Sequence, residues 1–301
     1  MPPPPKHVGV VSHPRREATW TVADRIAASL EAYGVGVWQF RSWDDNALEA
    51  IQGDTDLVVV VGGDGAMLRA ARACSTHNVP VLGVNMGYLG FLPEVSDPDA
   101  WDYHLHKLMN GDYWVESRMM VEARVVRDGV TIASGEALND VVVTRDRALG
   151  TVLLQTYIDN YWATTYHADA LIIATPTGST AYALAAGGPI LPPELHNILI
   201  VPVAAHLSMD RAIVISEGSS VQVVISPERD NDTRIVLDGT ELSALQPNDT
   251  VDIGATSNQG LFVRMRDRNY FYRSLLDRLE PRMPSRATPD PEHLQIQIDD
   301  A

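Results

Sequence analysis

Four continuous apolar runs alternate with amphipathic stretches in the first hundred residues. The runs are His7 to Ser12, Val35 to Phe40, Asp56 to Val61 and Val79 to Asn85. Buried strands of a parallel sheet have this uninterrupted pattern because helices cover both faces of the sheet. Alternation of such strands with helices predicts a Rossmann-like parallel α/β domain over residues 1–110.

Three helices are predicted between and after these strands. Gly34 is placed to end the first helix, and the second begins near Ala66, directly after the third strand. Ser96 or Asp97 caps the third helix, which Gly111 ends. Apolar residues three or four positions apart mark the first and third helices: Val22, Ile26, Leu30 and Tyr33, then Trp101, Leu105 and Leu108.

After Gly111 the pattern changes to short strand-like segments joined by turns, and Asp128-Gly129 suits a tight hairpin. This pattern of short strands and turns predicts a C-terminal antiparallel β-sandwich domain over 111–267. One exception is Thr175 to Pro189, where a loop of Ser, Thr and Gly opens an alanine-rich helical turn. A last helix is predicted near Tyr272 to Leu279, and the tail 284–301 is rich in proline and polar residues, so we expect it to be disordered.

Composition narrows the class of protein. The chain is 45% hydrophobic, and no apolar run approaches the roughly 20 residues of a membrane span. No apolar signal region precedes the first strand, and Cys74 is the single cysteine, so we expect a cytoplasmic protein without an internal disulfide. The net charge of −16 argues against general nucleic-acid or anionic-membrane binding. We expect a bound polyphosphate to arrive with Mg²⁺.

The third strand ends in Gly-Gly-Asp-Gly, which places Asp64 in a glycine turn with a helix directly after it. Ligands of open α/β sheets gather at the carboxyl ends of strands, and helix N-termini bind anions. The turn lacks the Lys-Ser/Thr of a Walker A motif, and Leu68 stands where a dinucleotide fingerprint has its third glycine. An aspartate here can accept a proton from an attacking hydroxyl while N–H groups receive charged oxygens. A purely structural turn is the alternative interpretation.

The second candidate loop is Thr-Pro-Thr-Gly-Ser-Thr-Ala-Tyr, which ends at Tyr182. Its hydroxyls and its glycine favour a ligand-binding loop, and an elaborate helix cap is the alternative. Tyr182 is a candidate for stacking on a base. Asn139, Asp140 and Asp169 lie near strand ends and by themselves fit ordinary turn residues. No spacing of His, Cys and Asp suggests a structural metal site, so no metal ligand is predicted.

Four segments in this order resemble the successive motifs of the NAD kinase family. They are VVVVGGDGAMLRAAR, GVNMGYLGFLPEV, LNDVVV and HADALIIATPTGSTAYALAAGGPIL, and the resemblance runs from His7 to Leu279. It implies transfer of the ATP γ-phosphoryl group to the 2′-hydroxyl of the adenosine ribose of NAD, with Mg²⁺ accompanying ATP. It also implies that the helix within 268–283 packs back on the first domain and that the chain forms a homodimer or homotetramer.

The resemblance also assigns roles by matching positions. Asp64 matches the catalytic aspartate, and Gly63 and Gly65 share its turn. Asn139 and Asp140 match the pair that holds the adenosine portion of NAD. The remaining matched positions are Thr180, Ala181 and Tyr182 of the adenine-binding loop, Asp169 near the nicotinamide, Arg69 at an often basic position, and the binding positions His167 and Ala185.

Several positions depart from the family pattern and leave the preference between NAD and NADH open. They are Asp140 for glutamate, His167 for arginine, Ala170 for glycine, Ala185 for serine, Thr240 for glutamine, and Arg211, which aligns only with a shift of one residue. A non-catalytic dinucleotide-binding sensor of the same fold is one alternative function. A lipid kinase is another, because lipid kinases share the Gly-Gly-Asp-Gly loop.

Overall fold

The computed structural model describes residues 2–41, 51, 53–87, 90–145, 150–206, 208–228 and 233–279. They belong to two compact units, Met1–Arg266 and Asp267–Ala301. The second unit contains the helix α6 (Tyr270–Leu279), close to where apolar spacing predicts it. The tail 284–301, predicted to be disordered, lies outside the described residues, and the packing of 268–283 on the first domain stays a prediction. None of the helices in the described ranges is long and apolar enough to cross a membrane.

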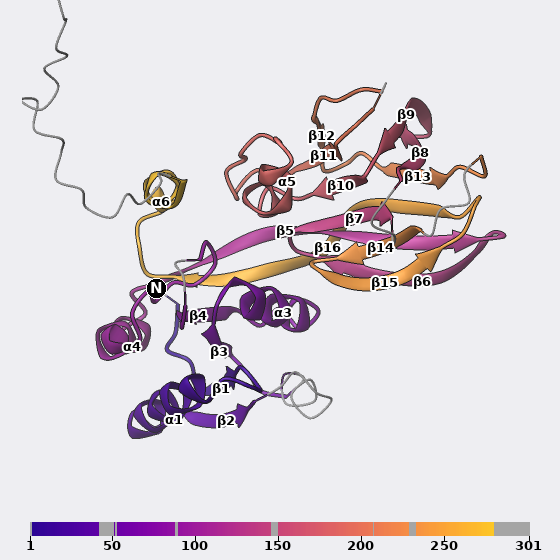
Figure 1. Ribbon diagram of the computed structural model, residues 1–301. Coiled ribbons are helices and arrows are strands. Elements are labelled where there is room, and N and C mark those ends of the chain that lie inside the picture. Colours follow the sequence, from indigo (N-terminus) through magenta and orange to yellow (C-terminus); the bar gives the residue numbers. More distant parts are fainter. Residues whose placement is uncertain are drawn as a thin grey trace, which may run out of the picture. The chain divides into compact units, whose positions relative to one another are not determined.

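The N-terminal half of the first unit is a parallel sheet with the strand order β2-β1-β3-β4 (Figure 1). Its strands are β1 (His7–Ser12), β2 (Gly36–Phe40), β3 (Leu57–Gly62) and β4 (Val81–Asn85). The helices α1 (Glu17–Ala32) and α4 (Trp101–Met109) cover one face, and α3 (Asp64–Ser75) covers the other. All of β3 is buried, which explains its run of valines and confirms the predicted α/β architecture.

The predicted helix ends agree with the backbone. Gly34 and Gly111 follow α1 and α4 in the left-handed region, with φ of 77° and 72°. Asp97 caps the short 3₁₀ turn η1 (Pro98–Ala100) that leads into α4, and its side chain accepts a hydrogen bond of 2.9 Å from Asp99 N. The N-cap of α4 itself is Ala100, without a side-chain hydrogen bond. The helix α3 begins at Asp64, two residues earlier than predicted, so this aspartate lies in the first helical turn.

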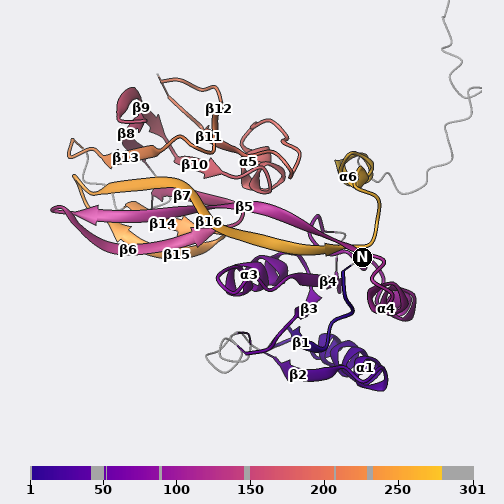
Figure 2. The same ribbon diagram turned by 180° about the vertical axis from the view of Figure 1, so that it is seen from behind.

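The strand β16 (Thr250–Arg264) extends the parallel sheet into the C-terminal half. Its Phe262 pairs in parallel with Val81 of β4, while most of its length pairs antiparallel with β5 (Trp114–Arg127). Figures 1 and 2 show these two long strands side by side. The same sheet includes β6 (Val130–Ala137), β8 (Val152–Ile158), β9 (Tyr161–Ala168) and β13 (Val221–Ile225). Because the sheet is continuous, the division into domains 1–110 and 111–267 stays a prediction.

A second, antiparallel sheet has the strand order β12-β11-β10-β7-β14-β15. Its strands are β7 (Asp140–Arg145), β10 (Ala170–Ala174), β11 (Asn197–Val203), β12 (Ile213–Ser216), β14 (Thr233–Leu237) and β15 (Thr240–Leu245). Apolar side chains of both sheets form one buried cluster between them, so the predicted β-sandwich is confirmed. Asp128 and Gly129, with φ of 50° and 77°, make the predicted tight hairpin between β5 and β6. The helical turns η2 (Gly178–Thr180) and α5 (Tyr182–Ala185) interrupt this β region as predicted.

Candidate active site

Asp64 is the first residue of α3 and lies just after the carboxyl end of the central strand β3. Its carboxylate accepts two backbone hydrogen bonds from the segment after β4. The Phe91 N–H donates to Oδ2 at 2.9 Å, and the Leu92 N–H donates to Oδ1 at 3.0 Å. The helix N-terminus adds a favourable interaction with negative charge. The position of Asp64 is therefore set from two sides, by its own helix and by the 90–92 backbone.

The glycines around Asp64 have different steric roles. A Cβ on Gly90 would lie 2.1 Å from Asp64 Oδ1, so only glycine permits this approach of backbone to carboxylate. A Cβ on Gly63 or Gly65 would meet no described atom within 4 Å. None of the described residues fills the space beside these two glycines, whereas Gly90 is required for packing against the aspartate.

Arg69 and Arg72 follow Asp64 on α3 and line an open pocket of about 390 Å³. Glu136 and Thr240 line the same pocket. Arg69 is exposed and Arg72 is half-buried. Residues three apart on a helix lie on the same face, so both guanidinium groups are available to one anionic ligand. The predicted phosphate-facing position of Arg69 stays a prediction.

Asn139 and Asp140 lie at the start of β7, and Asp238 holds their backbone. The Asp238 carboxylate accepts hydrogen bonds from the backbone N–H groups of Leu138, Asn139 and Asp140, at 2.9, 2.8 and 3.1 Å. Asp140 is only 6% exposed. Burial, followed by the charge of Asp238, raises the pKa of Asp140 from 3.8 to about 7. Burial also raises the pKa of Asp238, against its three backbone donors and the charge of Arg72. This end of the site therefore holds two close carboxyl groups, one of which titrates near neutrality.

The pH dependence of stability should report the buried Asp140. Its pKa is higher in the fold than in the unfolded chain, so folding favours the neutral acid, and stability is lost as pH rises from about 4 to about 7. Asp140→Asn removes this loss. Between pH 4 and pH 8, the unfolding free energy of the unsubstituted protein should therefore fall by roughly 2–4 kcal/mol more than that of the variant. Urea titrations at both pH values measure this difference, and an equal pH dependence of the two proteins would contradict the assignment.

The Thr175–Thr180 loop packs against the same strand start. Thr175 N donates to the Asn139 carbonyl at 2.9 Å, and the Thr175 hydroxyl donates to the Leu138 carbonyl at 2.5 Å. The Ser179 hydroxyl donates to the Pro176 carbonyl at 2.6 Å. Thr175 and Ser179 are fully buried. These two hydroxyls therefore stabilise the loop by bonding to its backbone and do not face a ligand. For Thr175 and Ser179 the structural interpretation of the loop is the one that holds.

The end of the loop is accessible. Thr180 and Ala181 are half-buried, Ala185 is exposed, and the Tyr182 side chain is 46% exposed. A tyrosine that belonged to the core would be buried, so its exposure leaves the ring available for stacking on a base. The structure brings Asn139 and this loop together, because a Cβ on Gly178 would lie 2.0 Å from the Asn139 carbonyl oxygen.

Asp169 lies at the other end of β10 from this loop. Thr144 pairs with Ala170, next to Asp169, whereas Asp140 pairs with Ala174, so the two predicted aspartates are separated by the length of a five-residue strand. At about 3.4 Å per residue this is roughly 17 Å. The Asp169 carboxylate forms a two-point ion pair with Arg145, at 2.8 and 3.1 Å. The half-buried His167 lies beside it on β9, and its Nε2 is buried without a hydrogen-bond partner among the described residues.

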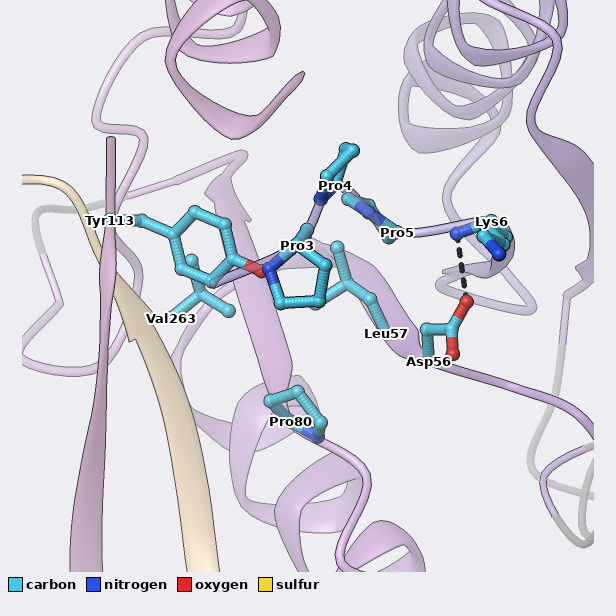
Figure 3. Close-up of a pocket in the computed structure, with 9 residues that line it drawn as sticks. All are labelled: Pro3, Pro4, Pro5, Lys6, Asp56, Leu57, Pro80, Tyr113 and Val263. Carbon is cyan, nitrogen blue, oxygen red and sulfur yellow. Dashed lines mark hydrogen bonds between the residues drawn. The ribbon is translucent and has the colours of Figure 1, made fainter. Parts of the chain in front are cut away.

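A second pocket, of about 380 Å³, lies elsewhere in the fold (Figure 3). Lys6, Asp56 and Pro80 line it, and they directly precede β1, β3 and β4. These residues mark the amino ends of the parallel strands, while Asp64 follows the carboxyl end of β3. Because ligands of α/β sheets bind at carboxyl ends, this pocket is not part of the candidate site.

Several residues that shape the site have no distinctive local sequence pattern. Asp238 holds the backbone of Asn139 and Asp140, and Arg145 pairs with Asp169. Gly90 lies against the Asp64 carboxylate. The Asp238-Gly239 dipeptide is a turn motif, and only that property is visible in the sequence. Among residues in the described ranges, no group of three or more His, Cys, Asp or Glu side chains is close enough to hold a metal ion.

Sequence models of two protein domains match the chain. The ATP-NAD kinase N-terminal domain matches residues 13–113, and the ATP-NAD kinase C-terminal domain matches residues 138–265. Curated NAD kinases from Pseudomonas fluorescens (strain SBW25) and Pseudomonas aeruginosa (strain LESB58) are 42% and 43% identical to it. Each alignment spans 216 residues, which is 72% of this chain and 73% of the relative.

Two solved structures share the fold. Yeast NADH kinase complexed with NADH matches with a TM-score of 0.82 at 24% identity, over 92% of this chain and 87% of that chain. An NAD kinase from Archaeoglobus fulgidus in complex with ATP matches with a TM-score of 0.72 at 23% identity, over 89% and 97%. The fold therefore agrees with the domain matches and with the Pseudomonas relatives, and the chain belongs to the NAD kinase family of phosphotransferases.

Proposed function

We propose that this chain transfers the γ-phosphoryl group of ATP to the 2′-hydroxyl of the adenosine ribose of NAD, giving NADP and ADP. The single observation that carries the proposal is the Asp64 carboxylate, fixed at the carboxyl end of β3 by the Phe91 and Leu92 amides beside open glycines. Phosphoryl transfer leaves little covalent chemistry to the protein, so positioning and charge stabilisation dominate.

In this proposal Asp64 orients the ribose hydroxyl and accepts its proton while the oxygen attacks the γ-phosphorus. The bond from the γ-phosphorus to the β,γ-bridging oxygen breaks, and ADP leaves with that electron pair. Two backbone N–H donors hold the carboxylate, and ionised oxygens keep further acceptor capacity for a substrate hydroxyl. Groups placed in this way contribute about 10²–10⁴-fold to the rate.

The positive groups nearest in sequence to Asp64 support a phosphate site. Arg69 and Arg72 share one pocket, and the open Gly63 and Gly65 adjoin the α3 N-terminus. Mg²⁺ binds phosphate oxygens and keeps several waters, and it needs few protein ligands, so we propose that it enters with ATP. When bound, it would neutralise charge on the triphosphate, and Asp64 is the acidic side chain placed to contribute a ligand.

The two ends of the dinucleotide would occupy different ends of β10. Asn139, Asp140 and the exposed Tyr182 form the proposed adenosine side, and Thr180, Ala181 and Ala185 belong to the same loop region. Asp169, paired with Arg145, and His167 form the proposed nicotinamide side. A separation of roughly 17 Å suits an extended dinucleotide.

Incubation of purified protein with ATP, Mg²⁺ and NAD should yield NADP, and excess EDTA should abolish the yield because it removes Mg²⁺ from ATP. Parallel reactions with NADH, and with sphingosine or diacylglycerol, measure acceptor choice. Binding of NAD without NADP formation would replace the proposal with a dinucleotide sensor. Phosphorylation of lipid alone would replace it with a lipid kinase.

We also propose that the protein is cytoplasmic and forms a homodimer or homotetramer. Support for the first comes from Cys74, the single cysteine, which is free, because a chain without a disulfide fits a reducing compartment. Support for the second comes from Tyr161 and Trp162 on the edge strand β9, which are 81% and 63% exposed. A solution mass equal to one chain would contradict the assembly.

A further inference from the structure

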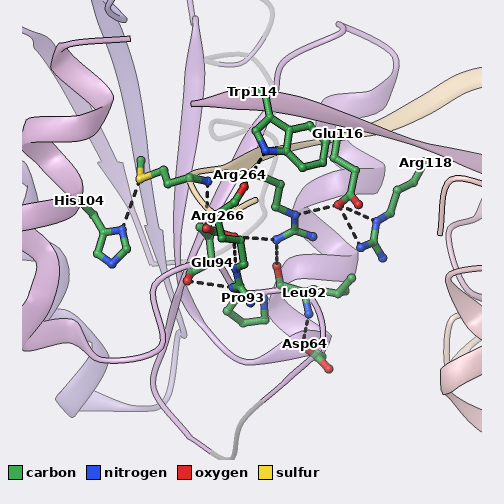
Figure 4. A network of polar contacts seen from close by, with 11 residues as sticks. Asp64, Leu92, Pro93, Glu94, His104, Trp114, Glu116, Arg118, Arg264 and Arg266 are labelled. Carbon is green, nitrogen blue, oxygen red and sulfur yellow. Dashed lines mark hydrogen bonds and ion pairs between the residues drawn. The ribbon is translucent and has the colours of Figure 1, made fainter. Parts of the chain in front are cut away.

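A buried ion-pair network lies behind the Asp64 segment (Figure 4). Its members come from β5, β16 and the segment that follows β4. On paired strands, Arg264 is opposite Trp114 and Phe262 is opposite Glu116, so Arg264 and Glu116 are diagonal neighbours on one face of the sheet. Side-chain exposure is 1% for Arg264 and 7% for Glu116. Buried charges need polar partners, so the hydrogen bonds of these side chains show which backbone segments the network holds in place.

Arg264 joins the network to the backbone that holds Asp64. Its Nε donates to Glu116 Oε2 at 2.8 Å, and its Nη1 donates to the Leu92 carbonyl at 2.7 Å. The N–H of the same Leu92 donates to Asp64 Oδ1 at 3.0 Å. Figure 4 shows this sequence of groups from Glu116 through Arg264 and Leu92 to Asp64. Leu92 thus has its carbonyl held by the network and its N–H directed at the aspartate.

Glu116 connects the same network to the Thr175–Thr180 loop. Its Oε2 also accepts from Arg118 Nε and Nη2, at 3.1 and 3.0 Å. The Nη1 of Arg118 lies 3.5 Å from the Thr177 hydroxyl oxygen, at the limit of a hydrogen bond. The network therefore contacts both the segment that orients Asp64 and the loop next to Asn139. The described hydrogen bonds join Arg264 and Glu116 to Asp64 through Leu92.

We propose that Arg264 is a positioning residue for phosphoryl transfer, which holds the Leu92 carbonyl and so restrains the Leu92 backbone, whose N–H keeps Asp64 Oδ1 in the reactive orientation. This proposal rests on the proposed function, in which Asp64 accepts the proton of the ribose hydroxyl. Displacement of a reacting group by about 1 Å can lower a rate by a factor of about 100. Loss of the Arg264 contact should therefore reduce turnover more than it reduces substrate binding.

Arg264→Lys tests the proposal because lysine keeps the charge but cannot reach the Glu116 carboxylate and the Leu92 carbonyl with one planar group. We expect kcat to fall tenfold to a hundredfold, with KM for ATP and for NAD changed less than threefold. The matched control is Arg127→Lys, at the other end of β5. Arg127 donates two hydrogen bonds to the buried Asp249, at 2.8 and 2.7 Å, and has no bond to the Leu92 backbone among the described contacts, so Arg127→Lys should leave kcat unchanged.

A readout independent of activity is the amide proton resonance of Leu92 in protein labelled with ¹⁵N-leucine. Its hydrogen bond to a carboxylate shifts this resonance downfield, so Arg264→Lys should move it upfield, and Arg127→Lys should not. If Arg264→Lys does not fold, Glu116→Gln takes its place, because it keeps the side-chain shape and removes the charge paired with Arg264 Nε at 2.8 Å, while Glu94 stays 3.6 Å from Nη1. The same changes in kcat and in the Leu92 resonance are expected.

Asp64→Asn, measured in parallel, separates failure of this proposal from failure of the proposed function. If Asp64→Asn is slow while Arg264→Lys has normal kcat, Arg264 has no positioning role and the function stands. If Asp64→Asn has a normal kcat, Asp64 is not the proton acceptor, and the positioning role of Arg264 is wrong as well. The double variant should be no slower than Asp64→Asn, and a further tenfold loss would overturn the proposal because Arg264 would then act elsewhere.

Discussion

Asp64→Asn should lower kcat for NADP formation by about 10²–10⁴-fold, because asparagine cannot accept the proton of the ribose hydroxyl. The amide keeps one acceptor oxygen and places an NH₂ group where the second oxygen stood. One of the hydrogen bonds from Phe91 and Leu92 is therefore lost, and stability should fall by about 1–3 kcal/mol. The chain should remain folded, with KM for ATP and NAD within a few-fold of the unsubstituted values. Steady-state kinetics with a thermal melt measure both effects.

Asp56→Asn is the matched control for this experiment. Asp56 also accepts two backbone N–H groups, from Lys6 at 2.7 Å and His7 at 2.9 Å, but at the amino edge of the same sheet. Asp56→Asn makes the same chemical change in the same unit. Asp56 directly precedes β3, whereas Asp64 follows the opposite end of that strand. We expect normal kcat. A normal kcat for Asp64→Asn as well would remove the proton-acceptor role, and an equal loss in both variants would indicate a general effect on the fold.

Gly178→Ala should have the second large effect, on stability and NAD binding together. The added Cβ would lie 2.0 Å from the Asn139 carbonyl oxygen and 2.6 Å from its carbon, so backbone must move on one side. Overpacking of this kind costs about 1–3 kcal/mol or more. The loop and the start of β7 should separate, which displaces Asn139 from Tyr182. We expect the KM for NAD to rise at least tenfold and the melting temperature to fall by roughly 5–10 °C.

Gly254→Ala controls for the loss of backbone freedom alone. A Cβ at Gly254, on β16, would meet no described atom within 4 Å, so the substitution adds a methyl group without a clash. Its melting temperature and its KM for NAD should stay close to the original values. If Gly178→Ala behaved in the same way, the contact between the loop and Asn139 would have no role in forming the adenosine side of the site.

The strands and helices could be predicted from the sequence because their patterns are local. The buried β3 produces an unbroken run of valines, and α4 has apolar residues at helical spacing ahead of Gly111. The shift from parallel to antiparallel strands is also visible near Gly111, where amphipathic helices stop. These features depend on residues within a few positions of one another, so one sequence is enough to detect them.

The contacts that fix the site could not be predicted in this way, because they join distant parts of the chain. Asp238 bonds the Asn139 backbone across 99 positions, and Leu92 bonds Asp64 across 28. Glu116 and Arg118 are two apart on β5, which gives them a common face, but charged residues are normally exposed and their burial has no local pattern. The same limit explains Thr175 and Ser179, whose hydroxyls fit both a ligand and a cap until their partners are known.

The strand β16 has a consequence for synthesis of the protein on the ribosome. Until residue 264 has been made, β4 is the outer strand of an incomplete sheet, although all five of its residues are buried in the finished fold. The N-terminal half thus stays incomplete until a strand more than 160 residues further along the chain has been made, and its apolar edge is exposed until then. A chain that terminates before residue 250 would lack this strand, and it should aggregate or be degraded instead of persisting as a smaller kinase.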